Sequence, residues 1–242
     1  MLPEQLTSFK ARSLLCYHFT MSGETQKKRT TARNSTRDVT RGIMTKVIAI
    51  NGSPRTDGNT AILIRIMLEE LENENIRTEL VQLAGENVRG CTACMQCIEN
   101  KNRRCVIDDD IVNECIEKMA VADGIILGSP VYFADVTAEM KALIDRAGFV
   151  SMANDGLLKR KAGTAVVAQR RNGATHSLDT LCYFLLSQDV IVPGRQTVGV
   201  GRDIGDVYQD DESIAEAKNA GRNLAWLLKA LDKMRDDYSP SL

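Results

Sequence analysis

From residue 47 onward, the hydrophobic positions follow two periods in turn, one typical of strands and one typical of helices. Short apolar runs rich in β-branched residues predict five strands, at 47–50, 78–83, 124–127, 163–168 and 197–200. A further short extended run lies at 190–192. Apolar residues spaced three and four apart predict helices at 59–74, 111–121, 138–149, 177–186 and 213–234. Because parallel strands need crossover connections, this alternation predicts an α/β domain with a parallel sheet and helices on both faces.

The loops that follow the predicted strands are the first place to look for chemistry. In a sheet of this kind, ligands bind beyond the carboxyl ends of the strands. Three loops lie there, at 53–60, 129–134 and 169–175. We therefore expect the functional residues to come from these loops.

The first 43 residues differ from the rest of the chain. They hold eight Lys or Arg and three Asp or Glu, a formal charge of +5, and they are rich in Ser and Thr. The strand and helix pattern begins abruptly at Met44. Such a leader is typical of an organelle transit peptide, of a basic disordered arm or of a start codon assigned too far upstream. We expect one of the last two for 1–43, a single domain over 44–235 and a short tail over 236–242.

Composition restricts the function classes. The 242 residues include 43% apolar and 26% charged side chains, which is ordinary for a globular domain. The formal net charge of −1 gives no overall positive field for a nucleic acid or an anionic membrane. No apolar run approaches the ~20 residues that span a bilayer. We expect a soluble, cytoplasmic protein without a nucleic-acid or membrane partner.

The first loop, 52–60, leaves a predicted buried strand and opens a predicted helix. At a helix N-terminus, free backbone N–H groups and the helix dipole favour an anion. Ser53, Asn59 and Thr60 add short donors, and Arg55 adds a planar charged fork that suits phosphate oxygens. The loop lacks the motifs of triphosphate-binding loops and dinucleotide folds. It predicts a monophosphate site, and the alternative is a simple turn in which Asn59 or Thr60 is only a helix cap.

The second loop carries Tyr132 and Phe133 soon after the predicted strand at 124–127. An aromatic pair at the exposed end of a strand suits stacking against a flat heterocycle, and nearby backbone amides can hydrogen bond to its edge. The alternative is that both rings pack against the next helix. Both interpretations stay open at this point.

Four of the seven cysteines fall within residues 91–105, where Cys91, Cys94, Cys97 and Cys105 form the pattern C-x2-C-x2-C-x7-C. Disulfide frameworks belong mostly to short secreted chains, which favours a metal site or redox thiols in a reducing compartment. Two-residue gaps let one loop wrap several thiolates around an inorganic core, and four thiolates complete a [4Fe–4S] cluster. The alternatives are a thiol loop without metal and a zinc site, although structural zinc usually binds two separated pairs of cysteines.

Together, the first two loops resemble those of the flavodoxin-like NAD(P)H-dependent FMN reductase superfamily, in which one loop holds the FMN phosphate and a Ser/Thr-Pro-x-Tyr loop holds the isoalloxazine ring. The second motif matches at every position, whereas the first has one extra residue before Gly58. The resemblance implies a three-layer sandwich with a five-stranded parallel sheet in the order 2-1-3-4-5. It also implies an FMN site with Arg171 and Gly173 at the far edge of the flavin. The phosphate would be bound by Ser53, Arg55, Asn59 and Thr60, and the flavin ring would be lined by Pro130, Val131, Tyr132 and Phe133.

The cysteine loop narrows the resemblance to the iron–sulfur flavoproteins, a branch of the same superfamily. Membership would imply an electron-transfer flavoprotein in which the four clustered cysteines ligate one [4Fe–4S] cluster. It would also imply a ferredoxin-like or NAD(P)H electron donor, a small-molecule acceptor, and a homodimer or homotetramer. No acid–base side chain is needed for such electron transfer, so we expect no catalytic residue of that kind. Two alternatives stay open: an NAD(P)H-dependent FMN or quinone reductase without a cluster, and a redox-responsive or zinc-stabilised binding protein.

Four other residues have simpler interpretations. Cys115 and Cys182 sit in helical apolar patterns and are expected to pack as small hydrophobic side chains. His176 lies where a helix is expected to begin, which favours a surface or capping position. Trp226 is flanked by leucines and is expected in the core or at a subunit contact.

Overall fold

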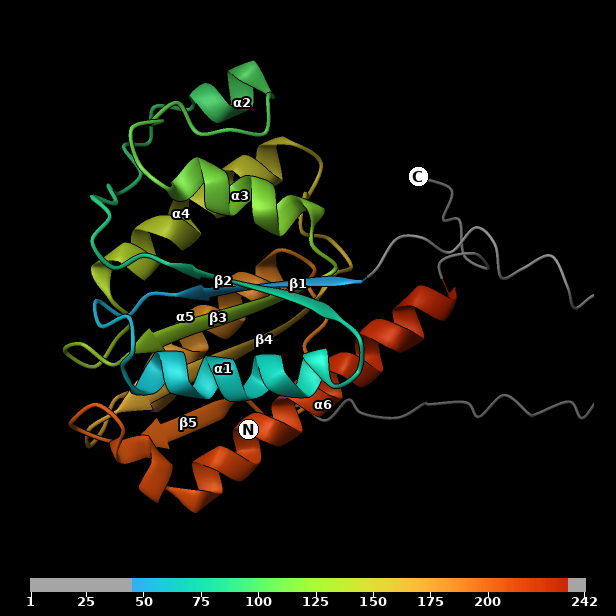
Figure 1. The fold of residues 1–242 in the computed structure, drawn as a ribbon. Coiled ribbons are helices and arrows are strands. Elements are labelled where there is room, and N and C mark those ends of the chain that lie inside the picture. The colour runs from blue at the N-terminus through green and yellow to red at the C-terminus, as the bar shows by residue number, and fades with distance from the viewer. Residues whose placement is uncertain (1–44, 235–242) are drawn as a thin grey trace, which may run out of the picture. The chain divides into compact units, whose positions relative to one another are not determined.

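The computed structural model describes residues 45–234 as a three-layer α/β sandwich (Figure 1). In this range, five parallel strands form one sheet in the order β2-β1-β3-β4-β5, with bounds β1 (Lys46–Asn51), β2 (Arg77–Gln82), β3 (Gly124–Pro130), β4 (Ala162–Gln169) and β5 (Thr197–Val200). The helices are α1 (Asn59–Glu72), α2 (Gln96–Asn100), α3 (Val112–Val121), α4 (Ala138–Ala153), α5 (Ala174–Ser187), the 3-10 turn η1 (Asp206–Gln209) and α6 (Asp211–Met234). The predicted extension at 1–43 and tail at 236–242 lie outside the described residues.

The sheet confirms the five predicted strands and their order. Each predicted apolar run overlaps one strand, and every neighbouring pair is parallel. The extended run at 190–192 is not a strand, because only Ile191 pairs, in an isolated bridge to Ala162. The chain then turns at Gly194, whose φ is +72°. It rejoins the sheet at Thr197, which pairs with Val166, so β5 lies beside the later half of β4.

Alternate residues of the central strands supply two separate cores, one on each face of the sheet. In β1, Ile48 and Ile50 belong to the core under α3, α4 and α5, whereas Val47 and Ala49 belong to the core under α1 and α6. Successive side chains of a strand point to opposite faces, so a strand covered on both sides needs an unbroken apolar run. Figure 1 shows α1 and α6 side by side on one face, with α3 and α4 on the other.

The long helix α6 packs one apolar stripe against the sheet and leaves Trp226 on its outer side. Leu224 and Leu228 are buried, whereas Trp226 is 70% exposed. Two residues along a helix turn through about 200°, so position 226 faces away from both leucines. The prediction of a core position for Trp226 is wrong, and its role as a subunit contact stays a prediction. Neither α6 nor any other helix within residues 45–234 is long and apolar enough to cross a membrane.

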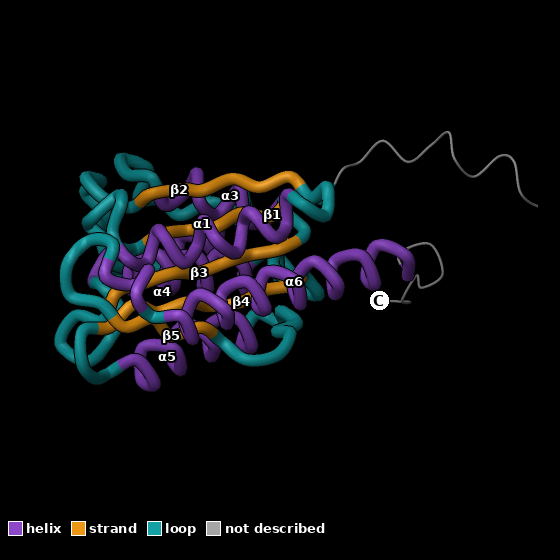
Figure 2. The backbone as a smooth tube through the Cα atoms, turned by 60° about the horizontal axis from the view of Figure 1, so that its bottom comes forward, coloured by secondary structure: helices purple, strands orange, loops and turns teal. Residues whose placement is uncertain are grey.

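The carboxyl ends of the strands meet at one edge of the sheet, where loops gather at the left of Figure 2. The backbone N–H of Gly52 donates to the carbonyl of Gly128 at 2.8 Å, and that of Val131 donates to the carbonyl of Ala168 at 2.9 Å. These bonds tie the loop after each strand to a neighbouring strand. We call the three loops 53–60, 129–134 and 169–175 the carboxyl edge. The helix α2 lies apart from it, beyond α3 and α4 (Figure 1).

Candidate functional site

The first loop of the carboxyl edge ends in a helix N-terminus without a side-chain cap. α1 begins after Gly58, whose backbone is extended. No side chain caps the first N–H groups of α1, and the first turn of this helix holds no acidic residue. The hydroxyl of Thr60 is buried and has no hydrogen-bond partner among the described residues. An uncapped N-terminus favours an anion, and a buried hydroxyl without a partner is costly unless a ligand satisfies it. The N-terminus of α1 therefore suits a phosphate group.

The residues before α1 form a turn that leaves an arginine at the surface. The N–H of Ser53 donates to Asn51 Oδ1 at 3.0 Å, and the N–H of Arg55 donates to Ser53 Oγ at 3.1 Å. Asn51 and Ser53 are buried, whereas Arg55 is exposed. Arg55 Nη1 donates to the carbonyl of Arg202 at 3.3 Å. A guanidinium has five N–H donors, so this single bond leaves others to meet an anion.

Asn59 has a different environment from the one that the sequence suggests. Its Nδ2 donates to the carbonyl of Asp203 at 3.0 Å, and its Oδ1 accepts from the N–H of Gly205 at 3.0 Å. The amide thus fixes the segment that follows β5 beside the first loop. It does not cap α1, so the interpretation of Asn59 as the cap of that helix is wrong. Its Oδ1 also accepts from the N–H of Val207 in η1 at 3.5 Å. Its role as a phosphate ligand stays a prediction.

A buried threonine that the sequence analysis did not single out joins the first two loops. Thr137 Oγ1 donates to the carbonyl of Gly52 at 2.8 Å and accepts from the N–H of Met140 at 3.3 Å, as the N-cap of α4. Its own N–H donates to Ser129 Oγ at 3.1 Å. A Thr immediately before a helical pattern is a capping signal, but its bond to Gly52, 85 residues earlier in the chain, has no sequence signature.

The second loop presents its aromatic pair outward. Tyr132 and Asp135 exchange backbone hydrogen bonds of 2.8 and 3.2 Å, and Phe133 and Ala134 between them have φ values of 47° and 69°. Tyr132 is 49% exposed and Phe133 is 108% exposed. The interpretation in which both rings pack against the next helix is therefore wrong for Phe133. Pro130 ends β3, and Val131 is held to β4, so both are fixed by the sheet.

The third loop approaches the second one at Gly173. This residue has a φ of +95°, and a Cβ placed on it would stand 2.8 Å from Ala134 Cα and from Val131 Cγ1. Only glycine combines that backbone conformation with so close an approach. Arg171 is exposed on the same loop. The structure thus brings the predicted residues of the second and third loops together.

An acidic side chain also binds α5 to the aromatic loop. Asp135 Oδ1 accepts from Thr180 Oγ1 at 2.9 Å, and Asp135 Oδ2 lies 3.4 Å from His176 Nε2. His176 is exposed, which agrees with the surface position expected for it. The pair packs α5 beside the second loop and brings no further titratable group to the exposed rings.

One pocket is lined by the four clustered cysteines, Cys91, Cys94, Cys97 and Cys105. The apolar side chains of Ile107, Phe149 and Val150 also line it. Cys91 and Cys94 are exposed, whereas Cys97 and Cys105 are partly buried. Burial raises the pKa of the Cys97 thiol. We call residues 89–110 the cysteine segment, because they include the four thiols and the stretch that closes the pocket.

The backbone of the cysteine segment is strained. Four of its residues have positive φ values, which residues other than glycine rarely adopt. These values are 53° at Ala93, 61° at Met95, 46° at Lys101 and 62° at Arg103. Each such residue costs on the order of 1 kcal/mol or more, and such conformations persist where the surroundings enforce them, often at ligand sites. The short helix α2 contains no buried residue. Burial of apolar side chains in α2 therefore does not account for these backbone conformations.

The spacing of the thiols argues against a single metal ion. Within residues 45–234, no group of three or more His, Cys, Asp and Glu side chains is placed to hold one ion. Zinc binds sulfur at about 2.3 Å, which requires four thiols within roughly 4 Å of one another. A [4Fe–4S] cluster has one thiolate on each of four irons, so its ligands stand farther apart. Four cysteine thiols around one pocket are the ligand type and number that such a cluster uses.

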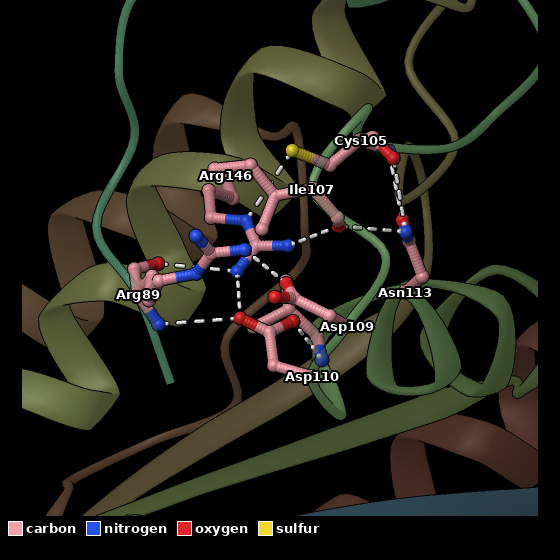
Figure 3. A network of polar contacts seen from close by, with 8 residues as sticks. Arg89, Cys105, Ile107, Asp109, Asp110, Asn113 and Arg146 are labelled. Atoms are coloured by element: carbon pink, nitrogen blue, oxygen red, sulfur yellow. Dashed lines mark hydrogen bonds and ion pairs between the residues drawn. The ribbon is translucent and has the colours of Figure 1, made fainter. Parts of the chain in front are cut away.

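Behind the pocket lies Arg146 of α4, which is 1% exposed (Figure 3). Its Nε donates to Cys105 Sγ at 3.3 Å, one Nη donates to the carbonyl of Arg89 at 3.1 Å and to the Asp110 carboxylate, and the other donates to the carbonyl of Ile107 at 2.7 Å. The side chains of Arg146 and Asp110 are both 0% exposed. Burial alone would raise the pKa of Asp110, but the hydrogen bond from Arg146 and two backbone N–H groups lower it below its usual value.

The sequence analysis missed Arg146, although a signal for it exists. The residue occupies a position in the apolar series of α4, between the buried Leu143, Ile144 and Ala147. A charged side chain on the buried face of a helix needs hydrogen-bonded and charged partners. The sequence does not say which partners these are, because Asp110 and Arg146 are 36 residues apart.

The comparisons with known proteins agree with this geometry. A family model described as NADPH-dependent FMN reductase matches residues 45–204, a range that includes the three loops of the carboxyl edge and the cysteine segment. The chain belongs to the NADPH-dependent FMN reductase family. Membership makes it an FMN-dependent oxidoreductase and overturns the alternative of a binding protein without enzymatic activity.

Two relatives define the branch of the FMN reductase family to which the chain belongs. An iron–sulfur flavoprotein of Methanocaldococcus jannaschii is 39% identical over 197 residues, which cover 78% of this chain and 100% of that protein. An iron–sulfur flavoprotein of Methanosarcina thermophila is 32% identical over 193 residues, which cover 79% of this chain and 99% of that protein. The prediction of the iron–sulfur flavoprotein branch is confirmed.

Solved structures confirm the fold of this FMN reductase family member. A flavone reductase superimposes with a TM-score of 0.60 at 18% identity, over 77% of this chain and 64% of that one. A flavodoxin from the domain Archaea superimposes with a TM-score of 0.50 at 14% identity, over 76% of this chain and 99% of that one. At such identities the likeness concerns the fold alone, and it confirms the flavodoxin-like sandwich.

Proposed function

We propose that this chain is an electron-transfer flavoprotein that passes electrons between FMN and one [4Fe–4S] cluster. The observation that carries the proposal is the pocket lined by Cys91, Cys94, Cys97 and Cys105, in a member of an FMN reductase family. Four thiols around one pocket fit the four ligands that such a cluster needs. The names of the relatives support the same proposal.

The FMN phosphate would bind at the N-terminus of α1. The free N–H groups there and the Thr60 hydroxyl would donate to its oxygens, and Arg55 would supply the opposite charge from the surface. Ser53 holds the turn that shapes this site. The buried and otherwise unpartnered hydroxyl of Thr60 supports this assignment most directly, because a phosphate oxygen would satisfy it.

The flavin ring would lie against the second and third loops. Tyr132 and Phe133 would cover its face, and the backbone of Pro130 and Val131 would meet its edge. Gly173 allows the third loop to come close, and Arg171 would stabilise negative charge at the far edge of the ring. When bound, FMN accepts a pair of electrons and releases them one at a time. The chain's own residues bind and orient the ring and shield one face of it from water.

The four thiols of the cysteine segment would be the metal ligands. A thiol must lose its proton to bind metal, so assembly of the cluster would release protons and favour higher pH. Burial raises the pKa of Cys97, so the loss of its proton would be favoured by the incoming metal. The six cysteines of the described residues are free, which supports a reducing compartment such as the cytoplasm.

The electron donor would be a ferredoxin-like protein or NAD(P)H, and the acceptor a small molecule. Lys101, Arg103 and Arg104 form an exposed basic run inside the cysteine segment, and none has an acidic partner among the described residues. An acidic electron-carrier protein would be attracted to this run, and the attraction would weaken as salt rises. We also propose a homodimer or homotetramer, for which the exposed Trp226 is a candidate contact.

A second candidate is an NAD(P)H-dependent FMN or quinone reductase that has no cluster, which the description of the family model favours. Anaerobic purification followed by assays of iron, acid-labile sulfide, zinc and FMN separates the two. About four irons and four sulfides with one FMN per chain support the electron-transfer flavoprotein. FMN without iron supports the reductase, and zinc in place of iron contradicts the assignment of a [4Fe–4S] cluster.

A further inference from the structure

The cysteine pocket is held from behind by one buried cation. The Arg146 guanidinium is enclosed among the side chains of α4 and the closing stretch of the cysteine segment (Figure 3). Removing a guanidinium from water costs several kcal/mol unless its charge and donors are satisfied. The Asp110 carboxylate balances the charge, and three groups besides that carboxylate accept its N–H bonds. Asp110 neutralises the charge, whereas the remaining bonds satisfy the buried N–H donors and fix the orientation of the guanidinium.

The bonds to backbone carbonyls and to Asp110 fix the plane of the guanidinium. One Nη is shared by Arg89 O and Asp110, and the other is bound to Ile107 O. Because the guanidinium is planar and its donors form a rigid fork, these acceptors also set the direction of the Nε–H bond. That bond is aimed at Cys105 Sγ, at 3.3 Å. The donor is therefore held in a fixed direction beside the thiol.

We infer that Arg146 is a positioning residue for the cluster, one that holds Cys105 as its fourth ligand and makes the cluster easier to reduce. The inference rests on the proposed function, because it requires a cluster in the pocket. Reduction adds one electron, supplied by the donor or by the reduced flavin, and no bond forms or breaks. The added negative charge is shared by the ligating sulfurs, so an N–H donor to Cys105 Sγ stabilises the reduced state more than the oxidised state.

The test is the midpoint potential of the cluster in variants that contain FMN, measured by anaerobic redox titration. Arg146→Lys keeps the positive charge beside Asp110 but has no Nε–H donor for Cys105, and Arg146→Met removes both. We expect the potential to fall in the order wild type, Arg146→Lys, Arg146→Met. The expected shift for Arg146→Met is about a tenfold lower ratio of reduced to oxidised cluster at a fixed potential, which is about 59 mV for one electron.

Two control variants separate this effect from general disturbance. Asn113 holds the same stretch through the backbone of Cys105 and Ile107, at 2.7, 2.9 and 3.0 Å, without a bond to the sulfur. Lys141 is a partly exposed cation on the same helix, paired with Asp145. We expect wild-type potentials in Asn113→Ser and Lys141→Gln, although Asn113→Ser is expected to lower the thermal stability.

The outcomes distinguish this inference from the proposed function. A wild-type chain that binds no cluster contradicts the proposed function itself. Arg146 variants with four irons per chain and the wild-type potential overturn the inference and leave the function intact. Loss of iron from the Arg146 variants, with FMN retained and with full iron in Asn113→Ser, supports the holding of Cys105. Equal potential shifts in Lys141→Gln and Arg146→Met, with none in Arg146→Lys, assign the effect to net charge and overturn the inference.

Discussion

The carboxyl edge and the cysteine segment are built in opposite ways. The loops of the carboxyl edge follow buried strands and are joined to neighbouring strands by backbone bonds such as those at Gly52 and Val131. The cysteine segment contains four non-glycine residues with positive φ, against two in the carboxyl edge, and the exposed helix α2. It is held mainly by Arg146 and Asn113. A site on the sheet is shaped by folding itself, whereas a site on such a segment depends on a few polar anchors and on what it binds.

The largest expected effect comes from removing one thiol, which tests whether the cysteine segment and the carboxyl edge bind their groups independently. Cys105→Ala removes the proposed fourth ligand and the acceptor of the Arg146 Nε–H bond. We expect the four-iron cluster to be lost or converted to a smaller one, while FMN binds as in the wild type, because the carboxyl edge does not depend on this residue. Iron assays and the visible spectrum report the cluster, and flavin fluorescence reports FMN. An iron spectrum identical to that of the wild type would show that Cys105 is not a ligand of the cluster.

The reactivity of the thiols in the folded, metal-free chain sharpens the comparison. Burial raises the pKa of Cys115 to about 12, so this thiol stays protonated at all lower pH values. At pH 8 only about one molecule in ten thousand carries the Cys115 thiolate, which is the reactive form. We expect alkylation to modify the exposed Cys91 and Cys94 at least about a hundredfold faster than Cys115.

Mass spectrometry of peptides after timed alkylation measures this difference directly. Addition of denaturant is the control, because it exposes Cys115 and should bring its rate close to that of the other two. Rapid modification of Cys115 in the folded chain contradicts the burial on which the expectation rests.

A charge at the carboxyl edge should matter for the phosphate and not for the ring. Arg55→Ala removes an exposed guanidinium beside the N-terminus of α1. A hydrogen bond to a charged group contributes about 1.5 kcal/mol or more, so we expect FMN to bind about tenfold more weakly and riboflavin to bind with little change. Arg77→Ala, at the exposed start of β2 and the opposite end of the sheet, is the matched control. Equal losses for the two flavins contradict the assignment of the phosphate.

The smallest expected effect comes from one methyl group between the second and third loops. Gly173→Ala places a Cβ within 2.8 Å of the second loop at a residue with positive φ. We expect the free energies of FMN binding and of folding each to become less favourable by about 1 kcal/mol. Gly85→Ala is the control, because Gly85 has a φ of +82° and nothing within 4 Å of the added Cβ. If Gly85→Ala lowers FMN binding equally, close approach of the two loops plays no part.

The fold could be read from the sequence because its signals are local. The apolar runs of β1 and β3 and the spacing of α1 and α6 report burial on both faces of the sheet. The exception at 190–192 shows the limit of such signals, because an apolar run pairs only where the backbone turns allow it. The position of Trp226 teaches the same lesson, since a tryptophan flanked by leucines can still face outward on a helix.

The candidate site could be predicted only in part, because its anchors act over long sequence separations. The phosphate and aromatic loops have local signatures, and the cysteine spacing is local as well. The bonds of Thr137 to Gly52, of Asn59 to residues 203–205 and of Arg146 to Asp110 join distant stretches of the chain. No propensity or periodicity reports such pairs, and they decide where the local motifs lie in space.

The central claim is that each chain binds FMN and a cluster and that the two groups exchange electrons in the protein. An anaerobic reductive titration of the purified holoprotein tests it most directly. FMN accepts two electrons and the cluster one, so the account predicts about three electrons per chain. The absorbance of the flavin and of the cluster should redistribute between additions of reductant, as the two groups exchange electrons. Uptake of about two electrons, with only flavin absorbance changing, would contradict the account.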